Sequence, residues 1–182
     1  KHRYVYVETP KVACSTIKST LQKIELEQPD LKWKKLDAIH VKKQSPLASP
    51  ADVADLDEIL QGESYYRFCF VRNPYTRLLS AYLEKICGNG EQKSEILRRL
   101  GHNPRELTRE IRFEEFISAV VAQPVAEMDP HWRTQYHQTL QDVIEYDFIG
   151  RQESFELDFN SVLGNILEEG YEKYISSERG HK

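Results

Sequence analysis

The stretch that decides the predicted fold is Y-Y-R-F-C-F-V-R-N-P-Y, residues 65–75. Residues 65–71 are almost continuously apolar, as is typical of a strand buried on both faces of a parallel sheet. Asn73 can cap a helix through its side-chain oxygen, and Pro74 suits the first helical position, where a missing N–H costs nothing. We therefore predict a buried strand followed at once by a helix, with an apolar stripe of Leu78, Leu79, Tyr82 and Ile86.

Strands and helices alternate on both sides of this stretch. The pattern predicts strands at residues 4–7 and 143–149, a possible strand within 33–41, and helices at 15–26, 113–121 and 155–167. A further helix is predicted from Pro50 or Asp52 to Leu60, and residues 91–112 are expected to be partly helical. Because the connections are long enough for crossovers, we predict an α/β fold with a mainly parallel sheet.

Length and charge limit the classes of function. The 182 residues suit a single domain, and the net charge of −4 argues against binding to duplex nucleic acid. The longest apolar stretch, residues 116–122, is far too short to span a bilayer, and no signal-peptide pattern is visible. Since the chain starts at Lys1 and runs almost at once into a strand, we expect a segment trimmed from a longer protein at one or both ends.

The three cysteines, Cys14, Cys69 and Cys87, are not a disulfide framework, because their number is odd and their spacing irregular. No His/Cys cluster suggests zinc, so no metal is expected. Few and unpaired cysteines favour a reducing cytoplasm, as in a bacterial protein.

A polar segment, E-T-P-K-V-A-C-S-T-I-K, joins the first predicted strand to the first helix at residues 8–18. A helix start offers free N–H groups to a phosphate, Lys11 adds a mobile charge, and Ser15 and Thr16 add hydroxyls. The Walker pattern is absent, because this loop contains no glycine. An ordinary strand-to-helix turn with one surface lysine explains the same residues equally well.

A second anion site is predicted after the buried strand. Arg72 lies just past the strand end, at the sheet edge where open α/β sheets bind ligands. Arg77 and Ser80 share a helix face, and an arginine with a hydroxyl suits a phosphate monoester. The alternative is that both arginines pair with acidic neighbours on the surface, and for Arg77 we favour that alternative.

Together, the two stretches resemble the signature segments of the sulfotransferases that use 3′-phosphoadenosine 5′-phosphosulfate. P-K-V-A-C-S-T-I-K looks like the 5′-phosphosulfate loop, and F-V-R-N-P-Y-T-R-L-L-S-A-Y looks like the 3′-phosphate segment. D-P-H-W-R-T-Q at 129–135 and Y-D-F-I-G-R-Q-E at 146–153 are similar to segments of the chondroitin and HNK-1 type of carbohydrate sulfotransferase, sulfotransferase family 2. The resemblance runs with gaps over residues 4–163.

The resemblance implies a P-loop-like three-layer fold and sulfuryl transfer from this donor, without a metal, to a hydroxyl of a carbohydrate or related acceptor. Lys11 would stabilise the charge that grows on the departing bisphosphate. The implied donor-binding residues are Pro10, Lys11, Val12, Ala13, Cys14, Ser15, Thr16, Arg72 and Ser80. Two other classes stay open: a P-loop-like phosphotransferase, and a non-catalytic module that only binds the nucleotide.

The acceptor hydroxyl needs a base, and histidine suits that task. We prefer His40, expected to follow the second predicted strand at the same sheet edge as Lys11, and we expect His131 to bind or orient the acceptor. For each histidine a structural or solvated role is the alternative.

Two basic clusters would favour an acidic glycan if they are functional, although charge runs are usually solvated faces. The clusters are Lys32, Lys34, Lys35, Lys42 and Lys43, and Arg98, Arg99, Arg105, Arg109 and Arg112.

Trp132 either stacks on a sugar ring or belongs to the core.

The resembling animal enzymes are anchored in the Golgi membrane, so the Golgi lumen, with an anchor outside this chain, is the alternative to the cytoplasm.

Overall fold

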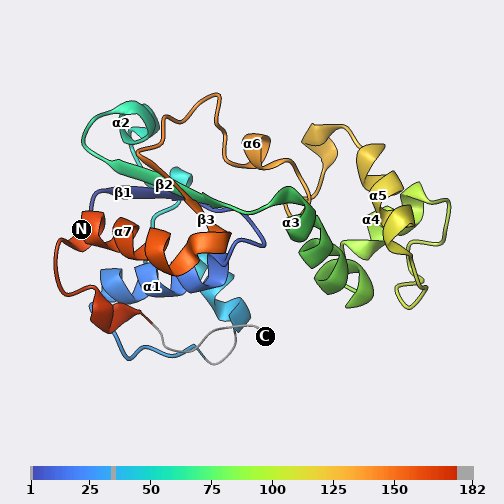
Figure 1. Cartoon of the computed structure of the whole chain (residues 1–182), viewed down its shortest axis with the longest axis horizontal. Coiled ribbons are helices and arrows are strands. Elements are labelled where there is room, and N and C mark those ends of the chain that lie inside the picture. The colour runs from blue at the N-terminus through green and yellow to red at the C-terminus, as the bar shows by residue number, and fades with distance from the viewer. Residues whose placement is uncertain (1, 34–35, 176–182) are drawn as a thin grey trace.

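A three-stranded parallel sheet forms the centre of the computed structural model, which describes residues 2–33 and 36–175 (Figure 1). The strands are β1 (Tyr4–Val7), β2 (Tyr66–Val71) and β3 (Phe148–Arg151), in the spatial order β1-β2-β3. The predicted α/β fold with a parallel sheet and flanking helices is therefore confirmed.

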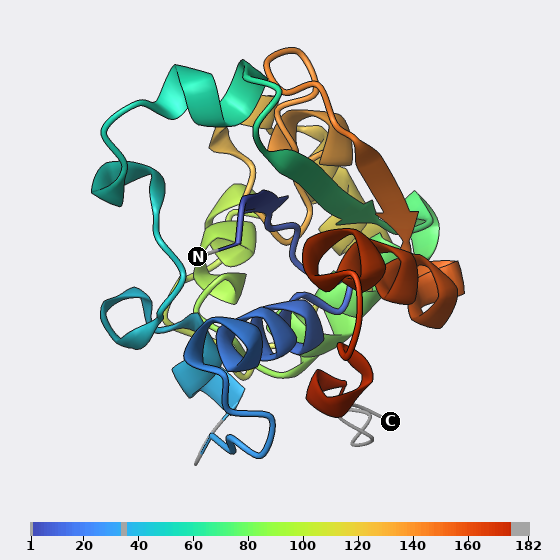
Figure 2. The same cartoon turned by 90° about the vertical axis from the view of Figure 1, so that its left-hand side faces the viewer.

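The two longest helices, α1 (Cys14–Leu26) and α7 (Phe155–Leu167), lie side by side on one face of this sheet (Figures 1 and 2). Phe68 and Phe70 of β2 point into the core that both helices share. Gly150 of β3 is required there, because a Cβ would lie 2.4 Å from the Phe70 ring. The close approach of strand and ring explains the glycine next to Ile149 in the last strand.

The opposite face of the sheet is covered by short elements. Arg67 is buried on that side and donates to the Asp147 carboxylate and to the carbonyls of Leu60 and Gly62. These contacts tie the end of α2 (Leu56–Gln61) and the segment before β3 to the central strand.

A second core lies beyond the carboxyl end of β2. There α3 (Pro74–Ala81) continues into the π-helical turn η4 (Tyr82–Cys87) and packs with α4 (Lys93–Arg99) and α5 (Phe113–Val121) (Figure 1). The remaining short elements are η1 (Leu36–His40), η2 (Lys42–Gln44), η3 (Pro50–Asp52), η5 (Val125–Glu127), α6 (Gln135–Gln138), η6 (Gln152–Ser154) and η7 (Glu172–Tyr174). Within the described ranges, no helix is long and apolar enough to cross a bilayer.

Most predicted elements are confirmed, including the Asn73 cap, whose side chain accepts from the N–H groups of Tyr75 and Thr76. The possible strand at 33–41 is wrong: residues 36–40 form a 3-10 helix, with residues 34–35 outside the described ranges. That helix packs against α1, where the Gln22 amide donates to the Ile39 carbonyl. A tertiary contact thus overrides a strand-like composition.

Three smaller predictions also need correction. The helix expected from residue 50 or 52 to 60 is interrupted, because Ser49 and Asp55 each cap a separate short helix. The last strand starts only at Phe148 rather than at residue 143. Leu79 is 42% exposed and so lies outside the apolar stripe.

Candidate functional site

The loop between β1 and α1 turns without glycine. Lys11 and Ala13 both adopt the left-handed backbone region, with φ of 71° and 65°. Between them, Val12 is fully buried and anchors the loop in the core. Side chains rarely tolerate this conformation, and such strain concentrates at functional sites. The turn places Ser15 and Thr16 in the first turn of α1, as the predicted anion loop requires.

Arg77 holds this loop against the segment that contains His131. Its buried guanidinium donates from Nε to the Pro10 carbonyl at 3.0 Å, and from Nη2 and Nη1 to the carbonyls of Pro130 and Arg133 at 2.7 and 2.8 Å. The favoured surface ion pair for Arg77 is therefore wrong. Burial lowers the pKa of Arg77 to about 10, which leaves the side chain charged at neutral pH.

Arg72 connects the two predicted anion-binding segments directly. Its Nη1 donates to the Lys11 carbonyl at 3.2 Å, and its Nε donates to Thr76 Oγ1 at 3.1 Å. The Gln135 side chain fixes the Arg72 backbone, accepting from its N–H at 2.8 Å and donating to its carbonyl at 2.7 Å. The loop of Lys11 and the end of β2 are therefore in direct contact.

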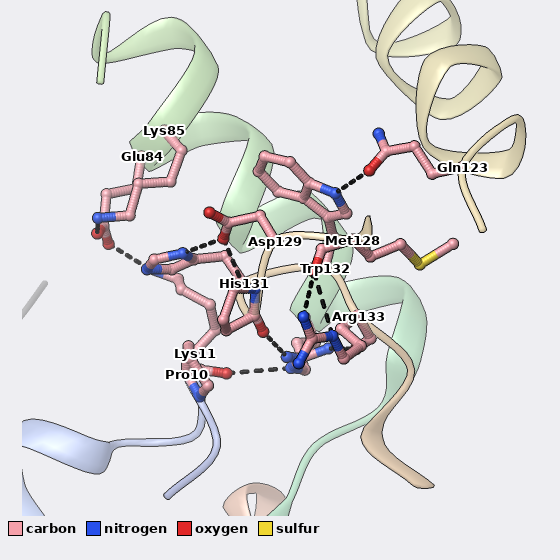
Figure 3. Close-up of polar contacts among 12 residues, drawn as sticks. Pro10, Lys11, Glu84, Lys85, Gln123, Met128, Asp129, His131, Trp132 and Arg133 are labelled. Carbon is pink, nitrogen blue, oxygen red and sulfur yellow. Dashed lines mark hydrogen bonds and ion pairs between the residues drawn. The ribbon is translucent and has the colours of Figure 1, made fainter. Parts of the chain in front are cut away.

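One face of the helix that follows Arg72 is turned toward the Lys11 loop. Thr76, Ser80 and Glu84 are spaced four residues apart along α3 and η4, so they follow one another on the helix surface. Arg72 contacts the first of them, and Lys11 Nζ forms an ion pair with Glu84, the last (Figure 3). The half-buried Ser80 lies between these two contacts in the sequence of this face.

Glu84 already shows how Lys11 holds an anion. Burial on its own would raise the pKa of Glu84, but hydrogen bonds from Lys11 and Lys85 lower it to about 2. Only 13% of the Lys11 side chain is exposed. Lys11 is therefore a largely enclosed cation paired with a carboxylate, and the interpretation as a free surface lysine does not fit.

His40 lies beside the loop, although the predicted reason was wrong. It is the last residue of the 3-10 helix η1 rather than a residue after a strand, and the packing of η1 on α1 brings it there. Its Nε2 is 2.9 Å from Ser15 Oγ, and its Nδ1 is 3.3 Å from both Glu8 Oε1 and Lys18 Nζ.

Glu8 is the anion of this group. Lys18 Nζ donates to its Oε2 at 2.9 Å. Burial would raise the pKa of Glu8, but the contacts with His40 and Lys18 outweigh burial and lower it to about 2. Cys14 is the opposite case, because burial and then Glu8 raise the pKa of its thiol. The thiol is therefore a poor nucleophile at neutral pH.

His131 lies close to the Lys11 side chain and pairs with Asp129 (Figure 3). Its Nδ1 is 2.6 Å from Asp129 Oδ1, which also accepts from the His131 backbone N–H at 2.9 Å. Figure 3 shows this pair on the same side of the loop as the Lys11–Glu84 ion pair. Burial would raise the pKa of Asp129, but the hydrogen bonds from His131 lower it overall. Both predicted histidines thus lie near the Lys11 loop. His40 contacts Ser15 and Glu8, whereas His131 contacts Asp129.

Trp132 belongs to the core. It is 5% exposed, packs edge-on against Phe116 with ring centroids 5.5 Å apart, and donates from Nε1 to Gln123 at 3.3 Å (Figure 3). Its indole ring is therefore too buried to stack on a sugar ring.

Ion pairs neutralise much of the arginine cluster. Arg98 and Arg99 pair with Glu95, and Arg109 and Arg112 pair with Glu106 and Glu115. In the lysine cluster, residues 34 and 35 fall outside the described ranges.

A hollow of about 340 Å³ opens at the carboxyl ends of β2 and β3, beside Arg72. Its lining includes Arg72, Asn73, Arg151 and Glu153, so two arginines and one carboxylate border the same space. This space is where the sheet-edge rule places a ligand.

Sequence reasoning missed four residues of the site: Glu8, Lys18, Glu84 and Gln135. The four-residue spacing from Ser80 to Glu84 is a signal that could have indicated one of them. Nothing in the sequence pairs Gln135 with Arg72 or Glu8 with His40, because these contacts depend on how distant segments pack.

Comparisons with known proteins identify relatives of the chain. The chain is 33% identical to carbohydrate sulfotransferase 14 of Mus musculus over 171 residues, covering 90% of this chain and 44% of that protein. It is 28% identical to carbohydrate sulfotransferase 11 of Rattus norvegicus over 202 residues, covering 95% of this chain and 53% of that protein. It is 30% identical to carbohydrate sulfotransferase 8 of Homo sapiens over 178 residues, covering 91% of this chain and 41% of that protein.

The chain thus spans about half the length of the curated relatives it matches. No solved structure is significantly similar to it. The family described as "Sulfotransferase family" matches residues 1–178. The chain therefore belongs to this sulfotransferase family.

Proposed function

We propose that this chain carries the donor site of an enzyme that moves a sulfuryl group from 3′-phosphoadenosine 5′-phosphosulfate to a hydroxyl of a carbohydrate acceptor. The observation that carries the proposal is the hydrogen bond from Arg72 Nη1 to the Lys11 carbonyl. It joins two anion-binding segments at one sheet edge, and the donor has two separate anionic groups. An ordinary nucleoside triphosphate has only one chain of phosphates and leaves the second segment unexplained.

Lys11 is the residue that we assign to the leaving group. The acceptor oxygen forms a bond to sulfur while the bond from sulfur to the 5′-phosphate oxygen breaks, and that oxygen keeps the electron pair. Lys11 Nζ, which pairs with the Glu84 carboxylate, would instead face the oxygen on which charge develops. The first-turn N–H groups of α1 and the Ser15 and Thr16 hydroxyls, which follow Lys11 in the chain, are assigned to the same phosphosulfate group.

Arg72 and Ser80 are assigned to the donor's 3′-phosphate. A guanidinium binds a phosphate through two parallel hydrogen bonds, and the arginine of this site is already fixed by Gln135. The adjoining hollow, whose lining includes Arg151, offers room for the nucleoside.

His40 is assigned as the base that takes the acceptor's proton at Nε2. The 2.9 Å contact with Ser15 Oγ supports this role, because it places the imidazole at the loop assigned to the phosphosulfate. His131 is assigned to the acceptor, from the other side of Lys11. An acidic glycan acceptor and residence in the Golgi lumen belong to the same proposal, and the vertebrate origin of the relatives favours the Golgi over a bacterial cytoplasm.

Transfer of radiolabelled sulfate from the donor to a panel of acidic and neutral glycans, chondroitin included, tests this function. We expect labelled glycan from the parent chain and far less from Lys11→Ala. Nucleotide binding without transfer to any acceptor would instead indicate the non-catalytic module. Magnesium-dependent turnover of ATP would indicate the phosphotransferase.

A further inference from the structure

Glu8, Ser15, Lys18 and His40 form a connected polar group at the start of α1, and the histidine in it has two possible tautomers. Its Nδ1 is 3.3 Å from a carboxylate oxygen of Glu8, which needs a donor, and 3.3 Å from the ammonium of Lys18, which needs an acceptor. One nitrogen cannot serve both. Which contact is a hydrogen bond therefore decides which ring nitrogen carries the proton.

In the first arrangement, Nδ1–H donates to Glu8 and Nε2 keeps its lone pair, which accepts from the Ser15 hydroxyl. In the second, Lys18 donates to Nδ1, and Nε2–H donates to Ser15. Only the first leaves Nε2 able to take a proton. The second would make His40 useless as a base at the atom that faces the loop.

The contacts favour the first arrangement. Lys18 Nζ lies closer to Glu8 Oε2, at 2.9 Å, than to the imidazole, so its hydrogen bond to the carboxylate is the better one. Glu8 is then left with Oε1 to accept from His40. A carboxylate beside Nδ1 also stabilises the positive charge that the ring acquires when Nε2 is protonated.

We infer that Glu8 is a positioning residue, which fixes His40 in the Nδ1–H tautomer with its basic Nε2 turned toward the phosphosulfate loop. This inference rests on the proposed role of His40 as the base. Cys14 Sγ lies within 4.8 Å of the ligand atoms of Glu8 and His40, but Lys18 supplies the positive charge in this group. The geometry therefore indicates proton handling rather than a metal site.

The first test reads the tautomer directly and needs no acceptor. Long-range nitrogen–proton NMR spectra of the full chain with isotope-labelled histidine, at a pH where His40 is neutral, should show the proton on Nδ1. Glu8→Ala should shift His40 toward the Nε2–H tautomer, and Glu8→Gln, which keeps an acceptor oxygen, should largely retain Nδ1–H. An Nε2–H tautomer in the parent chain, or no response to Glu8→Ala, would overturn the inference.

The second test is a double-mutant cycle on sulfuryl transfer. Glu8→Ala should lower kcat about 10-fold or more with little change in donor affinity, and Glu8→Gln should restore part of the loss. In a His40→Ala background, Glu8→Ala should have no further effect, since a positioning residue acts only through the residue it positions. Additive losses would mean that Glu8 acts through Lys18 or through the fold.

The pH profile of transfer distinguishes the role of Glu8 from the assignment of His40 as the base. The groups that face His40 are Glu8, Lys18, Ser15 and Cys14, and removal of the carboxylate leaves Lys18 as the charged neighbour. The acid limb of kcat/KM should therefore move to lower pH in Glu8→Gln. If His40→Ala is slow but Glu8 variants keep the parent rate and profile, the proposed base stands and the role of Glu8 is refuted. If His40→Ala is fully active, the base assignment and this inference both fail.

Discussion

Arg77 donates a hydrogen bond from Nε to the backbone carbonyl of Pro10 at 3.0 Å, across 67 positions of sequence. The same guanidinium binds the carbonyls of Pro130 and Arg133. One buried cation thus fixes the spacing between the Lys11 loop and the segment with His131.

We expect Arg77→Met to lower the free energy of unfolding in urea, by roughly 1–3 kcal/mol in total, because three partly buried carbonyls lose their partner. The matched control is Arg105→Met, at an exposed position, which should stay within about 0.5 kcal/mol of the parent. Equal stability of the two variants would show that the Arg77 contacts contribute nothing.

Lys11→Ala should lower kcat far more than it weakens binding of 3′-phosphoadenosine 5′-phosphate, by about 10²-fold or more, because the charge that it faces peaks in the transition state. Transfer rates at saturating donor, together with product Kd values, check this. Lys173→Ala, at an exposed lysine, serves as the control. Near-normal turnover of Lys11→Ala would show that Lys11 does not stabilise the leaving group.

The two histidines should separate in steady-state kinetics. His40→Ala should lose about 10²-fold or more in kcat with bisphosphate affinity unchanged, as expected when a general base is removed. His131→Ala should act mainly on the KM of the acceptor. The reverse pattern would exchange their roles, and normal kinetics in both variants would remove histidine catalysis from the mechanism.

Acid should weaken the fold partly through Glu8. Its pKa is lowered to about 2 from a model-peptide value of 4.5, so the folded state binds fewer protons than the unfolded chain. Its stabilising contribution is therefore complete above pH 4.5 and is lost as the pH falls toward 2. Across this range, the free energy of unfolding should fall less steeply with pH in Glu8→Gln than in the parent. Identical slopes would contradict the lowered pKa of Glu8.

The sequence was sufficient where local chemistry decides the structure. The apolar run of β2 and the Asn73–Pro74 start of α3 follow from burial and capping, which act over a few residues. His40 is the opposite case, because only the packing of η1 on α1 places it at the loop. The left-handed turn at Lys11 and Ala13 also has no glycine to signal it.

The same distinction holds within the site. The motif resemblance indicated Lys11 and Arg72, but it carried no information on the partners that hold them, Glu84 and Gln135. Arg77 looked like a surface residue because its partners are backbone carbonyls, which have no sequence signature. Residues that act through the backbone of distant segments are visible only in the fold.

The most direct test of the central claim is calorimetric titration of the 182-residue chain with 3′-phosphoadenosine 5′-phosphate, adenosine 5′-phosphate and ATP. We predict that the bisphosphate binds best. Arg72→Ala should weaken its binding by roughly 1.5–3 kcal/mol while leaving adenosine 5′-phosphate almost unaffected, since that ligand lacks the 3′ group. Equal weakening for both ligands, or tighter binding of ATP than of the bisphosphate, would contradict a donor site built on the Lys11 loop and Arg72.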